Sequence, residues 1–101
     1  MKKILVFIAT FALCIPQDSG WSIYNTSNTD IPSNSVQTIV LDNNGNKWIG
    51  TSSGLTKFDG TNWTTYTTSN SGIPHNDVEV IAIDSVGYIW VGTSSYGLAR
   101  L

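Results

Sequence analysis

Few side chains of this sequence are of the types that perform catalysis or bind metals, and they do not cluster. His75 is the only histidine and Cys14 the only cysteine among 101 residues. A metal site or an activated nucleophile needs several such groups close together. Neither a paired set of carboxylates nor a Ser-His-Asp arrangement is visible. The sequence therefore predicts a non-catalytic protein without a metal or cofactor. His75 is expected to be a loop residue, with contact to a ligand as the alternative.

Asp42 and Asp84 are the acidic residues that invite a functional interpretation, as calcium ligands or as paired acids. Each is followed three residues later by a glycine, Gly45 or Gly87. Asp and Gly are typical of tight turns, in which the carboxylate accepts hydrogen bonds from backbone N–H groups. We therefore expect both aspartates to be structural.

The four tryptophans could stack on sugar rings. However, Trp21 and Trp63 are 42 residues apart, and so are Trp48 and Trp90. Recurrence at a fixed spacing is what packing between repeated units requires. A core role is therefore favoured over sugar binding.

The tryptophan spacing belongs to a tandem repeat that organises the chain. Residues 42–51 return as 84–93, and residues 21–53 share 17 of 33 positions with 63–95 without a gap. A single insertion, Tyr96, then shifts the alignment by one residue. Repeats of about 40–45 residues with several short strands are typical of propeller blades or of a related array.

Each period contains four strand-like runs separated by turn signals, and helical periodicity is absent. The runs cover residues 36–42, 47–51, 55–58 and 63–67. This pattern predicts an all-β protein made of β-propeller blades with four antiparallel strands. By the phase of the repeat, residues 21–25 match an outer fourth strand, 36–67 a full blade and 78–101 a partial blade.

Several motifs of the repeat resemble those of a known family. They are Ile-Pro-x-Asn-x-Val, Asp-x-x-Gly-x-x-Trp-Ile/Val-Gly-Thr, Gly-Leu and Phe-Asp-Gly-x-x-Trp-x-x-Tyr. Together they are similar to the two-component regulator propeller repeat. The resemblance implies blades of four antiparallel strands in a periplasmic sensor domain, often of hybrid histidine kinases that respond to oligosaccharides. Similar repeats also occur in secreted or surface proteins without a kinase, and the resemblance transfers no catalytic residue.

The number of predicted strands is small for a propeller. Repeat arrays need several units to share a core, and propellers typically contain about four to eight blades. Residues 21–101 are therefore expected to form an incomplete propeller, as the N-terminal fragment of a longer one. The alternative is a short protein that completes a ring by self-association. The expected partners are thus further blades, in the same chain or in another copy.

Residues 1–19 have the pattern of a bacterial export signal. Two lysines precede an almost wholly apolar run, residues 4–15, that is too short to span a bilayer. A buried N-terminal strand or helix is the alternative.

The tetrapeptide Phe-Ala-Leu-Cys that ends at Cys14 resembles a lipobox, although Leu13 stands where a small residue is expected. Cys14 is therefore a candidate lipid anchor, with ordinary cleavage between Cys14 and Trp21 as the alternative. The product is expected in the periplasm, at the outer surface or in the medium.

The binding surface is expected on the loops at one end of the blades. In a four-stranded blade, the loop that enters the first strand and the loop between the second and third strands lie at the same end. Variable loops on a rigid scaffold commonly carry binding. The candidate ligand-binding residues are Ser52, His75, Asp77, Ser94 and Tyr96.

These observations favour an extracytoplasmic module that senses or binds a ligand, plausibly a glycan or another small ligand. The formal net charge is only −2 and there is no basic patch, which argues against nucleic acid as a partner. The alternatives are a structural or adhesive secreted repeat protein and, less favoured, a lyase of the propeller type.

Overall fold

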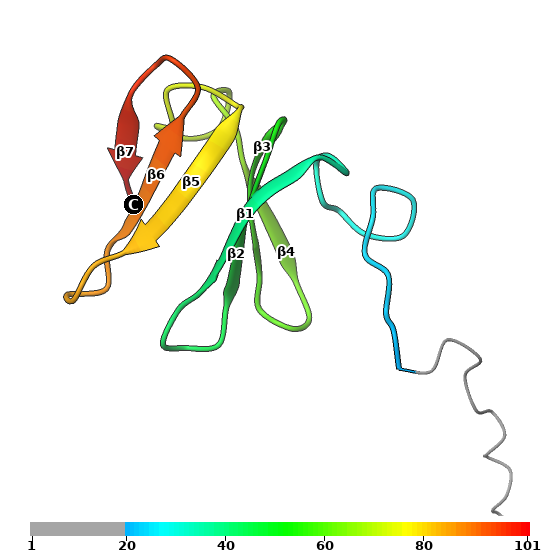
Figure 1. Ribbon diagram of the computed structural model, residues 1–101. Helices are drawn as coiled ribbons and strands as arrows, with labels where there is room; N and C mark the ends of the chain where they lie inside the picture. The colour runs from blue at the N-terminus through cyan, green and yellow to red at the C-terminus, as the bar shows by residue number, and fades with distance from the viewer. Residues whose placement is uncertain (1–19) are drawn as a thin grey trace, which may run out of the picture.

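The computed structural model describes residues 20–101, and the predicted export signal and Cys14 lie outside the described residues. Seven strands form two antiparallel sheets (Figure 1). The first sheet has the order β1-β2-β3-β4 and the second the order β5-β6-β7. The strands are β1 (Val36–Leu41), β2 (Lys47–Thr51), β3 (Gly54–Phe58), β4 (Trp63–Tyr66), β5 (Val78–Ile83), β6 (Ile89–Thr93) and β7 (Leu98–Arg100). The predicted all-β fold of four-stranded antiparallel propeller blades is confirmed.

Each blade begins with a hairpin whose turn is built by an aspartate and a glycine. The β1–β2 turn closes when Gly45 N–H donates to the carbonyl of Asp42, and the β5–β6 turn has the same bond from Gly87 to Asp84. Gly45 has a φ of 83° and Gly87 a φ of 104°. This backbone region is costly for residues with a Cβ, which explains why glycine stands at both positions.

The segment before β1 differs from its prediction. Residues 21–25, expected as an outer fourth strand, form no strand. A strand persists only as part of a hydrogen-bonded ladder, and no third strand of a preceding blade lies beside this segment among residues 20–101. Instead, the ring of Tyr24 packs 6.0 Å from Phe58 and 6.2 Å from Trp63, measured between ring centroids.

The hydrophobic core lies between the two sheets, where β5 packs against β1 and β2. Apolar side chains from facing surfaces of the blades form it, namely Trp48, Leu55, Val78, Ile81, Ile89 and Val91. Gly50 allows close approach at the centre of this contact, because an added Cβ would lie 2.6 Å from Val78 Cγ1 and 3.1 Å from the carbonyl oxygen of Val78. The blade-to-blade contact is therefore the element that makes one body of the two sheets.

The four tryptophans do not share one environment. Trp48 is buried, with 5% of its surface exposed, whereas Trp90 is 38% and Trp21 74% exposed. Trp63 is partly buried and stacks on Phe58 with ring centroids 4.2 Å apart. The expectation that all four are core residues therefore holds for Trp48 alone, because only Trp48 is covered by a second blade.

None of the described residues belongs to a helix long and apolar enough to cross a membrane.

Candidate functional site

The candidate binding loops of the second blade meet at one end of its sheet, at the top of Figure 1. Val78 pairs with Thr93 at this end of the β5–β6 ladder. Just beyond that pair, Ser94 N–H donates to the carbonyl oxygen of Asp77 at 3.0 Å. The loop that enters β5 is thereby joined to the loop between β6 and β7. The topology expected from the sequence thus brings these two loops together.

His75 and Tyr96 form the aromatic centre of this loop end. Their ring centroids are 4.7 Å apart and the ring planes deviate from parallel by only 3°. His75 is partly buried, whereas Tyr96 is 64% exposed. Tyr96 therefore presents an exposed aromatic surface, which is supported by the partly buried ring of His75.

The imidazole of His75 is held in place by the backbone of its own loop. Asp77 N–H donates a hydrogen bond of 3.0 Å to His75 Nδ1. Because Nδ1 accepts this bond, the neutral ring carries its proton on Nε2. The loop thus sets both the orientation of the ring and its tautomer.

Tyr96 reaches this position because the β6–β7 loop contains one residue more than its counterpart in the first blade. Ser95 accommodates the extra residue with a φ of 67°, the only positive φ of a non-glycine residue among residues 20–101. The loop is closed by Thr93, whose backbone N–H and Oγ1 donate to the carbonyl of Gly97 at 3.0 Å and 2.7 Å. The insertion is therefore an ordered feature of the loop.

Asp77 connects the loop end to the first blade. Its Oδ1 accepts a short hydrogen bond from Gln37 Nε2. Gln37 lies in the register shift between Val36 and Thr38 of β1, a bulge that redirects a side chain away from the regular alternation of a strand. Gln37 was not among the site residues predicted from the sequence. The available signal was a polar residue inside an apolar strand, matched by Glu79 in the second repeat.

The first blade forms the same loop contact with smaller side chains. Ser52 N–H donates to the carbonyl of Ser35 at 3.1 Å, which corresponds to the bond from Ser94 to Asp77. The hydroxyl groups of Ser33 and Ser52 lie 3.1 Å apart. Of the five candidate residues, the structure thus joins His75, Asp77, Ser94 and Tyr96 through direct contacts, whereas Ser52 contacts the loop of its own blade.

The side chains at this loop end supply stacking surfaces and hydrogen-bonding groups. A carboxylate, an amide and hydroxyl groups lie on the same loops as the aromatic pair of His75 and Tyr96, which is a set suited to binding polar molecules with flat apolar faces. Within the described part of the chain, no group of three or more His, Cys, Asp or Glu side chains is placed to hold a metal ion.

The turn aspartates lie at the opposite end of the sheets and act within their own hairpins. Asp42 accepts bonds of 2.9 Å from the backbone N–H groups of Asn44 and Asn46 and from Trp48 Nε1. Partial burial raises the pKa of Asp42, but the bonds from Trp48 and Asn46 outweigh it and lower the pKa to about 2. Asp84 likewise accepts a bond of 2.9 Å from Trp90 Nε1. The structural role expected for both aspartates agrees with these bonds.

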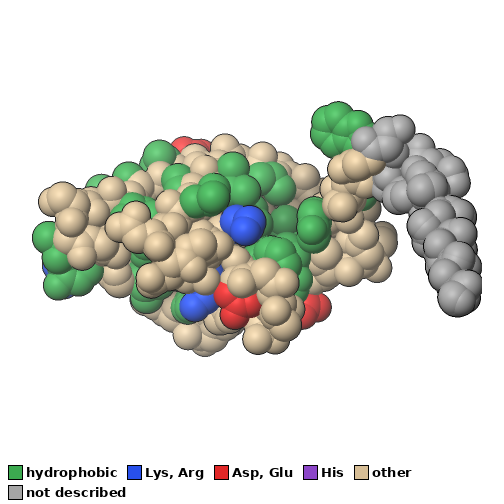
Figure 2. Space-filling model, turned by 90° about the horizontal axis from the view of Figure 1, so that it is seen from below, with side chains coloured by type: hydrophobic (Ala, Val, Ile, Leu, Met, Phe, Trp, Pro, Cys, Tyr) green, Lys and Arg blue, Asp and Glu red, His purple; other side chains and the backbone are tan. Residues whose placement is uncertain are grey.

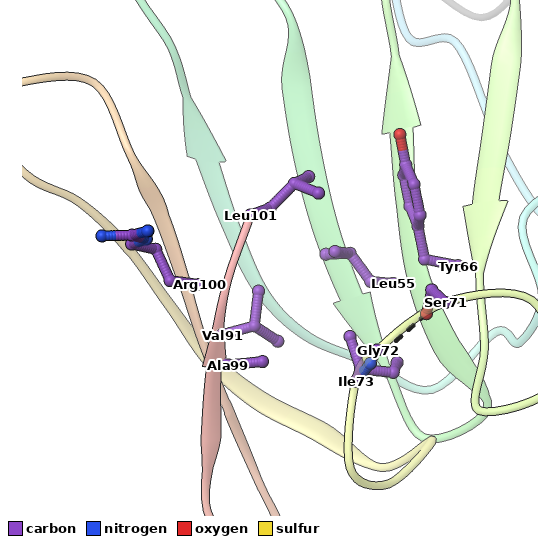
Figure 3. Close-up of a pocket in the computed structure, with 9 residues that line it drawn as sticks. All are labelled: Leu55, Tyr66, Ser71, Gly72, Ile73, Val91, Ala99, Arg100 and Leu101. Atoms are coloured by element: carbon purple, nitrogen blue, oxygen red, sulfur yellow. Dashed lines mark hydrogen bonds between the residues drawn. The ribbon is translucent and has the colours of Figure 1, made fainter.

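Two hollows lie elsewhere on the molecule. A cavity of about 80 Å³ remains between the blades, where Figure 3 shows Leu55 and Val91 pointing toward each other and Arg100 directed away. This volume is well below the roughly 300 Å³ typical of small-molecule pockets. A larger apolar groove of about 360 Å³ lies on the other face of the first sheet. Its lining consists of Tyr24, Ile31, Val36, Ile39, Leu41, Lys47, Ile49, Phe58 and Trp63.

The comparison with known families agrees with the geometry. Residues 30–53 and residues 72–95 each match the model of the two component regulator propeller. Both matches run from the loop that enters the first strand of a blade to the loop that follows its second strand, so they include His75 and Asp77 and end just before Tyr96. The family is a non-catalytic propeller repeat. No curated protein matches the chain. The chain therefore carries two repeats of the two component regulator propeller family, which together form a propeller module.

Proposed function

We propose that this protein is a non-catalytic, extracytoplasmic propeller module that binds a glycan at the loop end of its second blade. The observation that carries the proposal is the parallel stack of His75 and Tyr96, in which His75 Nδ1 accepts a hydrogen bond from the backbone N–H of Asp77. A sugar ring has an apolar C–H face and a rim of hydroxyl groups. Such a ligand needs an aromatic surface next to hydrogen-bonding groups, and the loop end supplies both.

The two aromatic residues have different tasks in this proposal. The exposed ring of Tyr96 is the stacking surface for the sugar. The imidazole of His75 stacks against the ring of Tyr96 and supports it, and His75 is itself held in place through Nδ1. Ser94 and Asp77 are adjacent through a backbone hydrogen bond, so the two loops that carry the aromatic pair also bring a hydroxyl group and a carboxylate to this end of the blade. Ser52, in the equivalent loop of the first blade, would contact a second sugar unit of an extended chain.

Location outside the cytoplasm is supported by the sequence before the described residues. Two lysines followed by the almost wholly apolar residues 4–15 have the pattern of an export signal, and Cys14 is the candidate lipid anchor. Mass spectrometry of the product exported from a bacterial host tests both points. A mature N-terminus after residue 14 without a lipid supports ordinary export, whereas a diacylated Cys14 supports a membrane-anchored module. Retention of the whole chain in the cytoplasm would contradict the proposal.

Binding is tested by titrating the full chain with a panel of neutral and acidic oligosaccharides while recording amide chemical shifts. We expect shifts in residues 72–77 and 94–97. The variants Tyr96→Ala and His75→Ala should each weaken binding by about fivefold or more, because stacking on a single aromatic ring contributes roughly 1 kcal/mol or more.

Tyr88→Ala is the matched control for these variants. Tyr88 is also an exposed tyrosine, 42% accessible, but it lies in the β5–β6 turn at the other end of the sheet. Its removal should leave the affinity unchanged. Equal weakening by Tyr88→Ala and Tyr96→Ala, or the absence of shifts with every oligosaccharide, would overturn the proposed site.

A further inference from the structure

We propose that copies of this chain associate head to tail, with the exposed face of the first sheet docking onto the exposed face of the second sheet of another copy. We call the first surface the leading face; its exposed apolar side chains are Val36, Ile39 and Leu41, whereas Ile49 on the same face is buried. We call the second surface the trailing face; its main side chains are Val80, Trp90 and Leu98. The occupant of each face is thus a second copy of the same protein.

The repeat itself shows what covers a leading face. Val78 and Ile81 of the second blade correspond to Val36 and Ile39 of the first. Val78 is fully buried and Ile81 is 4% exposed, because the first blade packs on them. The corresponding Val36 is 49% and Ile39 56% exposed. The first sheet therefore presents to solvent the same apolar surface that the second sheet buries inside the molecule.

The trailing face shows the reverse relation. In the first blade, Trp48 and Leu55 are 5% and 1% exposed, because they pack against the second blade. Their counterparts in the second blade, Trp90 and Leu98, are 38% and 64% exposed. Inside the molecule, the trailing side of the first blade thus packs against the leading side of the second blade. The leading face of the first blade and the trailing face of the second blade remain exposed.

The shape of the leading face agrees with this pairing. It carries the apolar groove of about 360 Å³, whereas only about 80 Å³ remains empty at the equivalent place between the blades. In the contact inside the molecule, Trp48 and Leu55 of the first blade pack against the corresponding face of the second blade. We infer that Trp90 and Leu98 of a second copy enter the groove in the same way. Figure 2, seen from the end of the aspartate turns, shows apolar side chains exposed on both blades and few charged ones.

One residue of the leading face departs from the interior pattern. Lys47 lines the groove, whereas its counterpart Ile89 is buried in the core. A lysine can lay its methylene groups along an apolar surface and keep its ammonium group in water. Lys47 is therefore compatible with docking at the rim of the groove.

The segment that precedes the first blade gains a role in this assembly. Trp21 and Tyr24 have the spacing of Trp63 and Tyr66 in β4. Tyr24 already lies against the leading face, where it lines the groove. In the second sheet, β7 has β6 on one side and an open edge on the other. Docking would bring residues 21–25 of one copy to the β7 edge of the next, where they would add a fourth strand by β-augmentation.

A contact between two different faces is heterologous, and such contacts produce closed rings or open filaments. Because each copy contributes two blades and propellers contain about four to eight, a closed ring would hold about two to four copies. The assembly is measured by light scattering coupled to size-exclusion chromatography and by sedimentation velocity on the full chain over a range of concentrations. We expect a concentration-dependent species of defined size larger than the monomer.

Two charge variants test the polarity of the contact. Ile39→Glu places a carboxylate on the leading face, and Leu98→Glu places one on the trailing face. Each variant alone should remain monomeric. When the two are mixed, the intact trailing face of the first can still dock on the intact leading face of the second, so the mixture should form a complex with one copy of each. Because Ile39 and Leu98 are exposed in the monomer, both variants should retain the circular dichroism of the wild type.

Val86→Glu is the matched control, because Val86 is also apolar, is 77% exposed and lies in the β5–β6 turn away from both faces. It should assemble like the wild type. A wild-type chain that stays monomeric at every concentration would overturn the proposal and assign both faces to other partners, such as blades of a longer chain. Loss of assembly in only one of the two face variants would also overturn it, since that result indicates a symmetric contact of one face with itself.

Discussion

The two blades carry nearly the same residues but use them in different surroundings. Trp48 and Trp90 each donate an indole hydrogen bond of 2.9 Å to the aspartate of the preceding turn. Trp48 is 5% exposed and Trp90 38%, because the second blade covers only the first of them. Equal sequence therefore produces equal local bonds, whereas the burial of a side chain depends on which blade lies beside it.

The loop ends show the converse. The backbone bond between the two loops is the same in both blades, from Ser52 to Ser35 and from Ser94 to Asp77. The side chains that this common framework carries differ, with serines in the first blade and the stack of His75 and Tyr96 in the second. Both blades thus have the same loop framework, but only the second blade carries the aromatic side chains on it.

The largest difference in stability is expected between variants of Trp48 and variants of Trp90. Trp48→Ala is expected to lower the free energy of unfolding by about 3–5 kcal/mol, because it leaves a cavity in the core. Trp90→Ala should cost roughly 1 kcal/mol or less. Urea unfolding followed by circular dichroism, at concentrations where the chain is monomeric, measures both. If Trp48→Ala abolishes the transition, the pair Trp48→Phe and Trp90→Phe gives the same ranking. Equal losses would contradict the assignment of the core to the contact between the blades.

The aspartates should show a smaller difference in the same direction. Asp42→Ala leaves the indole N–H of the buried Trp48 without its acceptor, which is expected to cost about 1–3 kcal/mol. Asp84→Ala should cost less, because water can reach the more exposed indole of Trp90. The same unfolding experiment compares them. A greater loss for Asp84→Ala would show that burial of the tryptophan is not what makes its bond important.

Lowering the pH should destabilise the fold by protonating the Asp42 carboxylate. Its pKa is about 2 in the folded protein, and an unfolded aspartate has a pKa of about 3.9. Because the folded value is the lower one, this group stabilises the fold above pH ~4 and loses its contribution as the pH falls toward ~2. Midpoints of thermal unfolding across this range should therefore fall more steeply for the wild type than for Asp42→Asn. Parallel curves would rule out a lowered pKa at this site.

The two matched glycines test how closely the blades approach. Gly50→Ala is expected to destabilise the protein by about 1–3 kcal/mol, since its Cβ would collide with the side chain of Val78 in the other blade and come tightly, to 3.1 Å, against the Val78 carbonyl oxygen. At Gly92 the added Cβ meets the side chain of Val80 at 2.6 Å, with the Val80 carbonyl oxygen at an ordinary 3.9 Å. Val80 is 55% exposed and can move, so Gly92→Ala should cost less. Unfolding midpoints of the two variants give the difference.

The smallest effect should come from the loop insertion. Ser95 has a φ of 67°, which costs a residue with a Cβ about 1 kcal/mol, whereas its counterpart Ser53 has no positive φ. Ser95→Gly should therefore be neutral or slightly stabilising, and Ser53→Gly destabilising by about 0.5–1 kcal/mol. Thermal unfolding of both variants resolves the sign. A loss of stability in Ser95→Gly similar to that in Ser53→Gly would mean that the loop stores no strain.

Much of the fold could be predicted because its determinants are local. The aspartate and glycine of each turn, the alternation in the strands and the repeat spacing operate over a few residues, and they indicated four-stranded blades correctly. The end of the blade at which the candidate loops meet also followed from the topology. The insertion of Tyr96 was visible in the alignment of the repeats.

Other features were decided only when the blades packed together. The sequence places Trp48 and Trp90, or Val36 and Val78, in identical positions, yet one member of each pair is buried and the other exposed. The strand expected at residues 21–25 did not form without a neighbour to pair with, and the bond from Gln37 to Asp77 joins residues 40 positions apart. Turn chemistry and strand periodicity act along the chain, whereas burial and strand pairing need a second surface. The sequence by itself therefore determined the blades, and only the tertiary structure decided which of their faces form the core.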